Sequence, residues 1–489
     1  MKILFTHSYF LHFDKKQLKT AMPYPPLATL YALAYLRENG FDVKLFDTQF
    51  CLNANEINAT IDNYRPDVFV IYDDGFNYLT KMCLTNMREA AIKMQTYAKQ
   101  KDCKVIVSSS DATDHEESYL SKNADVIIIG EAEQTLLELC TAFQKNESVV
   151  NIQGIAYLND KKKLIRTSKR AILKDLDFLP QPAWDLIDVN PYKNMWIKNH
   201  GYFSLNFVTT RGCPYKCNWC AKPIYGNRYN SHSAENIVLQ IKSLQQQFGF
   251  THIWFADDIF GLKPQWLKEF NNHIQQHKIK INYKIQSRAD LLLEDENIKY
   301  LAQSGCEKVW IGAESGSQKI LDAMDKGITV IQIYEATQLL KKHGIKVALF
   351  LQFGYLGENI EDINKTIEMV SKIMPDEIGA SISYPLPGTK FYDKVKEQLT
   401  KKSNWTDSDD LDLMFENTYS KAFYKTLHRY IHKKYRTSLS LQSFKKLKTF
   451  KLKTSDIYNM ASIGYYYPSL LFTKYKLKKL EPYAAKGLQ

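Results

Sequence analysis

The amino-acid sequence predicts an α/β protein with two successive parallel sheets and a basic helical region at its C-terminal end. Short apolar runs alternate with segments of helical spacing up to about residue 145, and the same alternation resumes between Ser204 and Tyr392. Such strand–helix–strand alternation is typical of parallel sheets that helices cover on both faces. With 489 residues, the chain exceeds the length of a single core, so we expect more than one domain.

Residues 1–145 are expected to form the first sheet, as a Rossmann-like domain. Pro25 and Pro26 open its first helix, and Gly40 ends that helix. No GxGxxG or GxxxxGK(S/T) pattern follows a strand, which argues against a dinucleotide and excludes a P-loop. A sheet of this kind binds ligands beyond the carboxyl ends of its strands. The expected strands are Lys2–Thr6, Asp42–Asp47, Asp67–Tyr72, Lys104–Ser109 and Asp125–Ile129.

Residues 146–195 are predicted to form a hairpin and a linker. The two expected strands, Val150–Leu158 and Lys163–Thr167, flank the turn-forming pair Asn159-Asp160. The proline-containing stretch Leu179–Pro182 follows, and its composition is typical of a linker.

Residues 196–400 are expected to form a second α/β unit of six strand–helix repeats. Ser233 and Thr329 precede helical stripes that end at Gly249 and Gly344. Six repeats predict a partial (βα)6 barrel, with function at the carboxyl ends of its strands. The expected strands are Ser204–Thr210, His252–Asp257, Lys280–Gln286, Lys308–Gly312, Ile345–Phe353 and Glu377–Ser383.

Three of the eight cysteines lie within eight residues, at the end of the first barrel strand: Cys213, Cys217 and Cys220. Thiolates this close in sequence can bind one metal centre, and sulfur ligands suit zinc or an iron–sulfur cluster. A structural zinc site usually has two separated ligand pairs, and the sequence has no second Cys pair. A cluster held by three cysteines leaves one iron open to a substrate. The spacing therefore favours a catalytic iron–sulfur site.

This CxxxCxxC motif, with Trp219 before its last cysteine, resembles the radical S-adenosylmethionine (SAM) superfamily. The resemblance implies a 4Fe-4S cluster held by the three cysteines, with SAM bound at the open iron. It also implies that one electron from the cluster cleaves SAM and releases a 5′-deoxyadenosyl radical. A reductant protein such as flavodoxin or ferredoxin would supply that electron.

Polar residues at the ends of the next barrel strands are candidates for binding SAM. The resemblance places an acid at Asp257 or Asp258 beside the amino group of SAM, since a cation relieves the repulsion of an acidic pair. Arg288 is expected either to bind the SAM carboxylate or to pair structurally with Asp290. A capping turn is the alternative for the acidic pair.

The turn after the fourth barrel strand and the cysteine loop supply further candidates. Glu314 and Ser315 lie in a Gly-Ala-Glu-Ser-Gly turn and can hydrogen-bond ribose hydroxyls. Tyr215, between the first two cysteines, is expected to pack beside the cluster and SAM. Packing within the core is the alternative for Tyr215.

The first domain resembles the cobalamin-binding domain that precedes many radical SAM cores. The resemblance rests on its five strands, the Pro25-Pro26 helix start and the Gly-Glu-Ala-Glu turn after the last strand. The DxHxxG pattern is absent, so that motif provides no histidine ligand to cobalt. A degenerate Rossmann-like domain that only helps to bind substrate is the alternative. The residues expected to line the corrin are Asp73, Ser108, Ser109, Gly130 and Glu131.

Residues 401–489 are predicted to form a basic helical region. Its part 421–489 holds 16 of the 65 Lys and Arg residues but only 2 of the 53 Asp and Glu residues, which leaves 49 basic and 51 acidic residues elsewhere. An amphipathic basic helix is expected over Lys421–Arg436. Aromatic residues interleaved with lysines favour a membrane surface or lipid-like substrate over nucleic acid. A solvated extension packed on the barrel is the alternative.

The sequence predicts a cytoplasmic location with peripheral membrane association. The opening segment is expected to be a strand rather than a secretory signal. The longest apolar-aromatic run, Ile463–Phe472, contains Pro468 and is shorter than the ~20 residues of a spanning helix.

Taken together, these features predict a cobalamin-dependent radical SAM enzyme that methylates an unactivated carbon. The resemblance is to class B radical SAM methyltransferases and to the anaerobic magnesium-protoporphyrin monomethyl ester cyclase group. One alternative is a cyclase or rearrangement enzyme without net methyl transfer, acting on a small molecule. The other is a non-catalytic, metal-stabilised binding protein. Methylthiolation is disfavoured because the four N-terminal cysteines are widely scattered.

Overall fold

The computed structural model describes residues 1–489 except 77–83, 223, 400–403, 406–410, 448–453 and 482–489. Its contacts divide the chain into two compact units. Unit 1 comprises Met1–Pro214, Ala221–Ile285 and Asn404–Asp410; unit 2 comprises Tyr215–Cys220, Gln286–Ser403 and Leu411–Gln489. This division differs from the boundaries predicted from the sequence, because it falls within the cysteine loop and within the barrel strands.

The first sheet of unit 1 has seven strands in the order β2-β1-β3-β4-β5-β6-β7. Its first five strands are parallel, as predicted, and the hairpin β6–β7 adds to β5 in antiparallel orientation. The hairpin therefore extends the first sheet instead of standing apart from it. The strands are β1 Lys2–Thr6, β2 Asp42–Leu45, β3 Val68–Tyr72, β4 Lys104–Ser108, β5 Val126–Ile128, β6 Ile155–Leu158 and β7 Leu164–Arg166.

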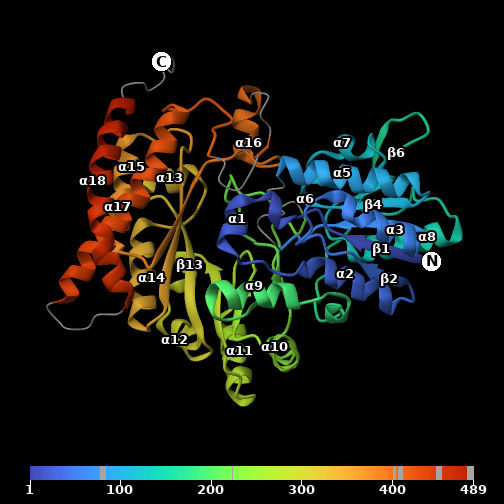
Figure 1. Ribbon diagram of the computed structural model, residues 1–489, viewed down its shortest axis with the longest axis horizontal. Coiled ribbons are helices and arrows are strands. Elements are labelled where there is room, and N and C mark those ends of the chain that lie inside the picture. Colours follow the sequence, from blue (N-terminus) through green and yellow to red (C-terminus); the bar gives the residue numbers. More distant parts are fainter. Residues whose placement is uncertain (77–83, 223, 400–403, 406–410, 448–453, 482–489) are drawn as a thin grey trace. The chain divides into compact units, whose positions relative to one another are not determined.

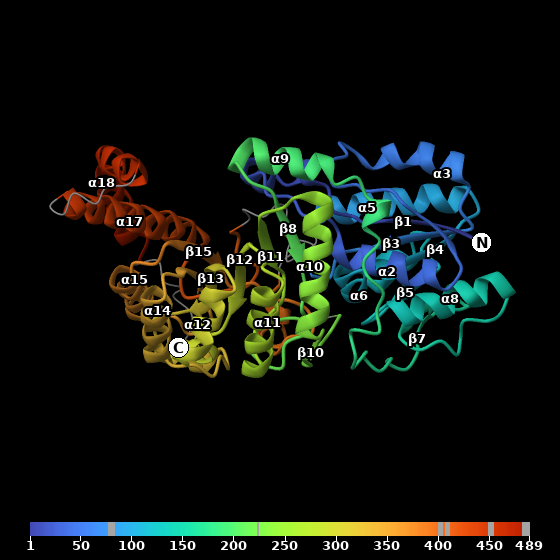
Figure 2. The ribbon, with the colours of Figure 1, turned by 90° about the horizontal axis from the view of Figure 1, so that it is seen from below.

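Helices cover both faces of this sheet, with α2 and α8 on one side and α3 and α5 on the other (Figure 2). Helix α2 begins directly after Pro26, and its Leu and Ala side chains are buried because it packs against its neighbours on nearly all sides. The helices around the sheet and in the following linker are α1 Lys15–Thr20, α2 Leu27–Glu38, α3 Asn58–Tyr64, α5 Thr85–Gln100, α6 Ser110–Asp114, α7 Glu116–Leu120, α8 Glu133–Lys145 and α9 Asn190–His200, with 3-10 turns at Leu11–Phe13, Ala54–Ile57 and Trp184–Leu186.

Unit 1 also contains the parallel strands β8 and β11 and the first part of β12, and these strands pair in that order. Ser233 caps α10 through the backbone N–H of Asn236, and Gly249 ends the helix in the left-handed conformation, as the sequence predicts. The elements are β8 Ser204–Phe207, β9 Thr210–Arg211, β10 Asn230–Ser231, α10 Ala234–Phe248, β11 His252–Phe255, α11 Pro264–Gln276 and β12 Asn282–Ser287.

Unit 2 contains the parallel strands β13, β14 and β15, with a register shift between Gly312 and Glu314. All six strands predicted for the barrel region are therefore present, with small differences at their ends. The elements are the 3-10 turn Ala289–Leu292, α12 Asp295–Gln303, β13 Cys306–Glu314, α13 Gln318–Ala323, α14 Val330–Lys342, β14 Lys346–Phe353, α15 Ile360–Ile373, β15 Glu377–Ile382, α16 Lys390–Val395 and the 3-10 turn Lys396–Gln398.

The C-terminal region of unit 2 is helical, as predicted. Helices α17 (Lys421–Leu447) and α18 (Thr454–Leu480) lie along each other (Figure 1). Helix α17 extends well past the predicted Lys421–Arg436, and Pro468 lies inside α18. Among the residues that the structure describes, no helix is both long and apolar enough to cross a bilayer.

Candidate active site

The first half of the cysteine loop belongs to unit 1 and leaves strand β9, which pairs with β10. Gly212 follows β9 with φ of +80°, a conformation that side chains disfavour. A Cβ at this position would also lie 2.6 Å from the carbonyl oxygen of Arg228. Only glycine therefore allows this close approach of backbone segments immediately before the buried Cys213.

Arg211 anchors the start of the loop to the turn after β5. Its guanidinium is buried and forms ion pairs of 2.6 Å with both Glu131 and Glu133. Its central carbon lies 5.2 Å from the ring centre of Tyr225. Glu131 also accepts a hydrogen bond from the backbone N–H of Leu173. Glu131 was predicted to line the corrin, and both of its oxygens already have partners within the protein.

Asp257 lies directly beside the strand that leads into the loop. Its Oδ1 accepts hydrogen bonds from the backbone N–H groups and hydroxyls of Thr209 and Thr210. Its Oδ2 is buried without a hydrogen-bond partner. Burial raises the pKa of Asp257 to about 7, against the opposing effect of these hydrogen bonds. Asp258 is less buried than Asp257. Asp257 thus presents one unused oxygen, as a group awaiting a donor or cation would.

The second half of the loop belongs to unit 2 and lies against Arg288. The guanidinium of Arg288 stacks on the ring of Tyr215, with its central carbon 3.6 Å from the ring centre. Its Nη1 lies 3.7 Å from the Sγ of Cys217, and its Nε donates to Asp290 over 2.9 Å. The structural pairing with Asp290 is therefore present. Arg288 still reaches the cysteine loop, so both predicted roles remain compatible with its position.

A second cation, Lys326, lies beside the same thiol and was missed by the sequence analysis. Its Nζ is 2.8 Å from Glu314 Oε1, and both side chains are buried. Burial alone would lower the pKa of Lys326, but Glu314 and the neighbouring Cys217 raise it above its usual value. Trp219 lies with its ring centre 6.0 Å from the lysine Nζ, and its buried Nε1 has no hydrogen-bond partner. Glu314 was predicted to contact ribose, and in the structure it forms an ion pair with Lys326.

Asn218 and Ser315 hold the surrounding loops in place. The Asn218 side chain donates to the carbonyl of Ala323 and accepts from the Tyr355 hydroxyl over 2.7 Å. Ser315 shares a hydrogen bond of 3.1 Å with Thr366 and accepts from the backbone of Ser317. Nothing in the sequence points to Asn218 except its place between two cysteines.

The residues predicted to line a corrin lie near the carboxyl ends of the first sheet's strands, and all of them except Gly130 are buried. Asp73 accepts hydrogen bonds from the backbone and hydroxyl of Ser8, and burial raises its pKa. The carbonyl of Ser108 accepts from the backbone of Asp73. Ser109 caps helix α6. Gly130 has φ of +85°, so it makes the turn that the sequence indicates. These contacts all belong to the fold, and the corrin role of these residues stays a prediction.

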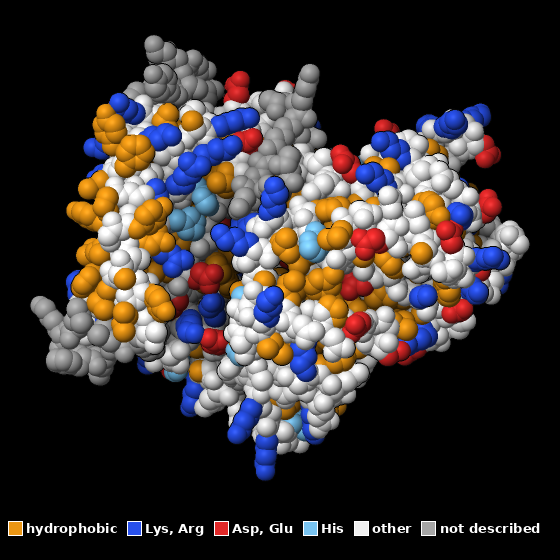
Figure 3. Space-filling view, viewed as in Figure 1, with side chains coloured by type: hydrophobic (Ala, Val, Ile, Leu, Met, Phe, Trp, Pro, Cys, Tyr) orange, Lys and Arg blue, Asp and Glu red, His pale blue; other side chains and the backbone are white. Residues whose placement is uncertain are grey.

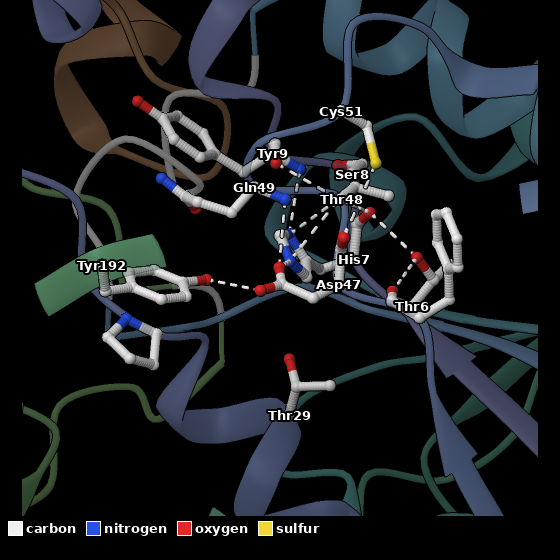
Figure 4. A network of polar contacts seen from close by, with 12 residues as sticks. Thr6, His7, Ser8, Tyr9, Thr29, Asp47, Thr48, Gln49, Cys51 and Tyr192 are labelled. Atoms are coloured by element: carbon white, nitrogen blue, oxygen red, sulfur yellow. Dashed lines mark hydrogen bonds and ion pairs between the residues drawn. The ribbon is translucent and has the colours of Figure 1, made fainter. Parts of the chain in front are cut away.

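A further polar network, not recognised in the sequence, lies at the same strand ends (Figure 4). The Nε2 of buried His7 is 2.8 Å from Asp47 Oδ1, and the hydroxyl of Tyr192 donates to Asp47 Oδ2 over 2.7 Å. Burial works against the charge of Asp47, but the hydrogen bonds from His7 and Tyr192 keep its pKa below its usual value. Helix α9 of the linker is thereby tied to the loops after β1 and β2.

The residues of the loop suit an anionic, sulfur-ligated group. Cys213, Cys217 and Cys220 form no disulfide bonds, and Arg288 and Lys326 beside Cys217 can balance the charge of thiolates. Within the described part of the chain, no three His, Cys, Asp or Glu side chains are gathered closely enough to hold one metal ion. The chemistry of the donors fits a cluster, and the ligand set itself stays a prediction.

Comparison with known proteins defines the class. Residues 207–370 match the model of the radical SAM superfamily, and they include all three cysteines and Arg288. Residues 207–370 therefore form a radical SAM domain, which supports an enzyme of this class. The alternative of a non-catalytic binding protein is not supported.

Curated relatives extend the similarity over most of the chain. An uncharacterised methyltransferase of Pyrococcus horikoshii is 27% identical over 388 residues, which cover 78% of this chain and 81% of the relative. The anaerobic magnesium-protoporphyrin IX monomethyl ester cyclase of Rubrivivax gelatinosus is 24% identical over 408 residues, covering 82% and 71%.

Two solved structures share the fold at 17% identity. The radical SAM methyltransferase TsrM of Kitasatospora setae, with cobalamin and a [4Fe-4S] cluster bound, superposes with a TM-score of 0.67 over 81% of this chain and 75% of its own. The cobalamin-dependent radical SAM enzyme OxsB, with aqua-cobalamin bound, gives 0.74 over 98% and 73%. The predicted succession of a parallel sheet, a radical SAM core and a helical end is thus a known architecture.

Proposed function

We propose that the protein is a cobalamin-dependent radical SAM enzyme that transfers a methyl group to an unactivated carbon. The observation that carries this proposal is the extent of the fold similarity, which covers 81% and 98% of the chain and includes the N-terminal sheet as well as the cysteine loop. The relative named as a methyltransferase favours methyl transfer over other outcomes.

In this proposal the three cysteines hold a 4Fe-4S cluster, and polar side chains around the cysteine loop bind SAM. Asp257 offers its unused Oδ2 to the amino group of SAM, and a positive charge there would favour the ionised carboxylate. Arg288, held by Tyr215 and Asp290, orients toward the SAM carboxylate and the Cys217 thiolate. When bound, the cluster and SAM would supply a 5′-deoxyadenosyl radical and cobalamin a methyl group.

The first sheet is proposed to hold cobalamin without a protein ligand to cobalt from a DxHxxG motif. Asp73 and Asp74 are buried carboxyls, and burial raises the pKa of Asp74 to about 6. Carboxyl oxygens can accept hydrogen bonds from the N–H groups of an amide-rich ligand. Ser108, Ser109 and Gly130 add small residues at the same strand ends.

A cyclisation or rearrangement is the second candidate reaction, because the magnesium-protoporphyrin cyclase relative aligns over 82% of this chain. Both reactions begin with the same radical, so the residues around the cysteine loop would serve either. Incubation of reduced enzyme with methyl-labelled SAM and cell extract separates them. Label in a lipid, peptide or other small molecule supports methyl transfer, whereas 5′-deoxyadenosine without labelled product supports cyclisation or rearrangement.

The cofactor content provides the direct test. Anaerobically purified protein is expected to hold about four irons and four sulfides per chain, and to bind stoichiometric corrinoid when purified with hydroxocobalamin. Cys213→Ala should lose the iron and the cleavage of SAM. Cys306→Ala is the matched control, since Cys306 is a buried thiol outside the loop, and it should retain both. Consistent absence of corrinoid would leave a radical SAM enzyme without cobalamin.

The proposed partners follow from this chemistry. A flavodoxin or ferredoxin supplies the electron, and the substrate is a small or lipid-like molecule in the cytoplasm. We further propose that the basic C-terminal region makes peripheral contact with a membrane. The 16 basic and 2 acidic residues of 421–489 support this contact, because anionic lipids attract basic segments.

A further inference from the structure

Helix α18 carries large apolar side chains on the side that faces solvent. Tyr465 and Phe472 are 67% and 70% exposed, although neighbouring helices bury similar residues. Figure 3 shows hydrophobic side chains gathered along this part of the molecule. At 100° per residue, these positions fall on one face of the helix. The exposed apolar face of α18 is formed by Ile457, Tyr458, Tyr465, Leu471, Phe472 and Tyr475.

The other side of α18 packs on α17, and much of that contact is polar. Thr473 accepts a hydrogen bond from Lys433 over 2.8 Å, and Asp456 accepts from Ser443 over 2.9 Å. Polar side chains therefore form part of the contact between α17 and α18, while tyrosines and Phe472 of α18 are exposed to solvent. A contiguous exposed apolar surface of this kind marks an interaction site in a folded protein.

Lysines lie at the C-terminal end of the same helix. Lys474, Lys476, Lys478 and Lys479 are exposed, and the Lys479 Nζ lies 4.6 Å from the ring centre of Tyr475. A second copy of this surface would bring like charges together, which disfavours self-association. Phosphate headgroups would pair with the lysines while the aromatic side chains enter the headgroup region, where Tyr is favoured.

We propose that the exposed apolar face of α18 docks on an anionic phospholipid surface, with the helix lying in the plane of the interface. The proposal rests on the peripheral membrane contact proposed above and names the surface that makes it. Pro468 lies on the exposed side of α18, so it does not interrupt the packing of α18 on α17. The binding energy is the sum of apolar burial and attraction to anionic headgroups, so it weakens with added salt and with loss of either component.

The test uses the full chain and sedimentation with vesicles of equal parts phosphatidylglycerol and phosphatidylcholine. The wild type is expected to bind these vesicles and to bind vesicles of phosphatidylcholine alone much less. The double variant Tyr465→Ser/Phe472→Ser should bind at least about tenfold more weakly, because it removes apolar area from the docked face. Lys478→Glu/Lys479→Glu should lose the preference for anionic vesicles.

Ile331→Ser is the matched control, since Ile331 on α14 is equally exposed at 67% but lies outside this face. It should bind vesicles as the wild type does. Wild-type binding by Tyr465→Ser/Phe472→Ser would overturn the proposal. So would a change from dimer to monomer in that variant by light scattering without loss of vesicle binding, because it would assign the face to a second copy.

A readout in solution separates this proposal from the proposed chemistry. Reductive cleavage of SAM to 5′-deoxyadenosine, measured without vesicles, should be the same in the wild type and in both α18 double variants. Vesicle binding without SAM cleavage in the wild type would contradict the proposed function alone. SAM cleavage without vesicle binding would contradict the docking surface alone.

Discussion

The two halves of the cysteine loop are held by opposite kinds of electrostatic contact. In unit 1, a single buried arginine, Arg211, satisfies two glutamates, and Asp257 is buried with neutral donors only. In unit 2, two cations, Arg288 and Lys326, lie beside the Cys217 thiol. The buried carboxyl beside the first half therefore favours a cationic group there. The two cations beside the second half favour an anionic group.

The largest effect is expected at Arg211, where the loop is anchored. Arg211→Met leaves Glu131 and Glu133 buried without their cation and should lower the free energy of unfolding by about 3–5 kcal/mol. Urea unfolding at neutral pH measures it. The control is Arg37→Met, whose exposed pair with Asp185 should cost about 0–1 kcal/mol. Equal costs for the two variants would contradict the anchoring role.

Asp257 should make stability depend on pH. A carboxyl whose pKa is raised from 3.8 to about 7 favours the folded state at low pH, and this contribution is lost as pH rises through about 7. Asp257→Asn removes the ionisation, so it should be more stable than the wild type by about 2–4 kcal/mol at pH 8. The difference should vanish near pH 4. Urea unfolding across this range measures it, and a pH-independent difference would contradict the raised pKa.

Lys326 tests the cationic half of the loop. Lys326→Met leaves Glu314 buried without its lysine, and the free energy of unfolding should fall by about 2–3 kcal/mol, since the carboxyl can take up a proton. Lys326→Arg should restore part of the loss by keeping the charge. Lys308→Met, which breaks an exposed pair with Glu377, is the control and should cost about 0–1 kcal/mol.

Arg288 should affect activity more than stability. Arg288 is buried but its partner Asp290 is partly exposed and can be solvated, so Arg288→Ala should lower the free energy of unfolding by about 1–2 kcal/mol. Cleavage of SAM should fall by about tenfold or more, because the variant removes the proposed contact with the SAM carboxylate. Arg288→Lys keeps the charge but not the planar stacking on Tyr215, and it should recover little activity. Full activity in Arg288→Ala would contradict the proposed role.

Sequence patterns were sufficient for the elements whose signals are local. Alternation of apolar runs located every parallel strand, and the caps Ser233 and Thr329 begin their helices as predicted. The cysteine spacing indicated a candidate site, because three thiols on one short loop need no tertiary contact to be recognised. Helix α17 was found from its spacing, but its end was not, since no glycine or proline marks it.

Contacts between distant segments could not be found in this way. Arg211 reaches Glu131 across 80 residues, and Arg288 reaches Cys217 across 71. Nothing local distinguishes Lys326 from other lysines until β13 brings Glu314 against it. The hairpin β6–β7 was predicted as an element separate from the first sheet. Packing decides which sheet edge a hairpin joins, and the local sequence does not show it. The exposed apolar face of α18 could not be recognised from the sequence, because apolar residues occur on all sides of that helix.

The linker helix α9 decides how the first sheet could be isolated for study. The Tyr192 hydroxyl donates to Asp47, and the indole Nε1 of buried Trp196 donates to the carbonyl of Pro23 over 2.8 Å. A fragment cut at the proline-containing linker near Pro182 would expose the surface under both rings and leave these acceptors to water. A separately expressed fragment that carries the first sheet would therefore need to continue through His200, so that it includes α9.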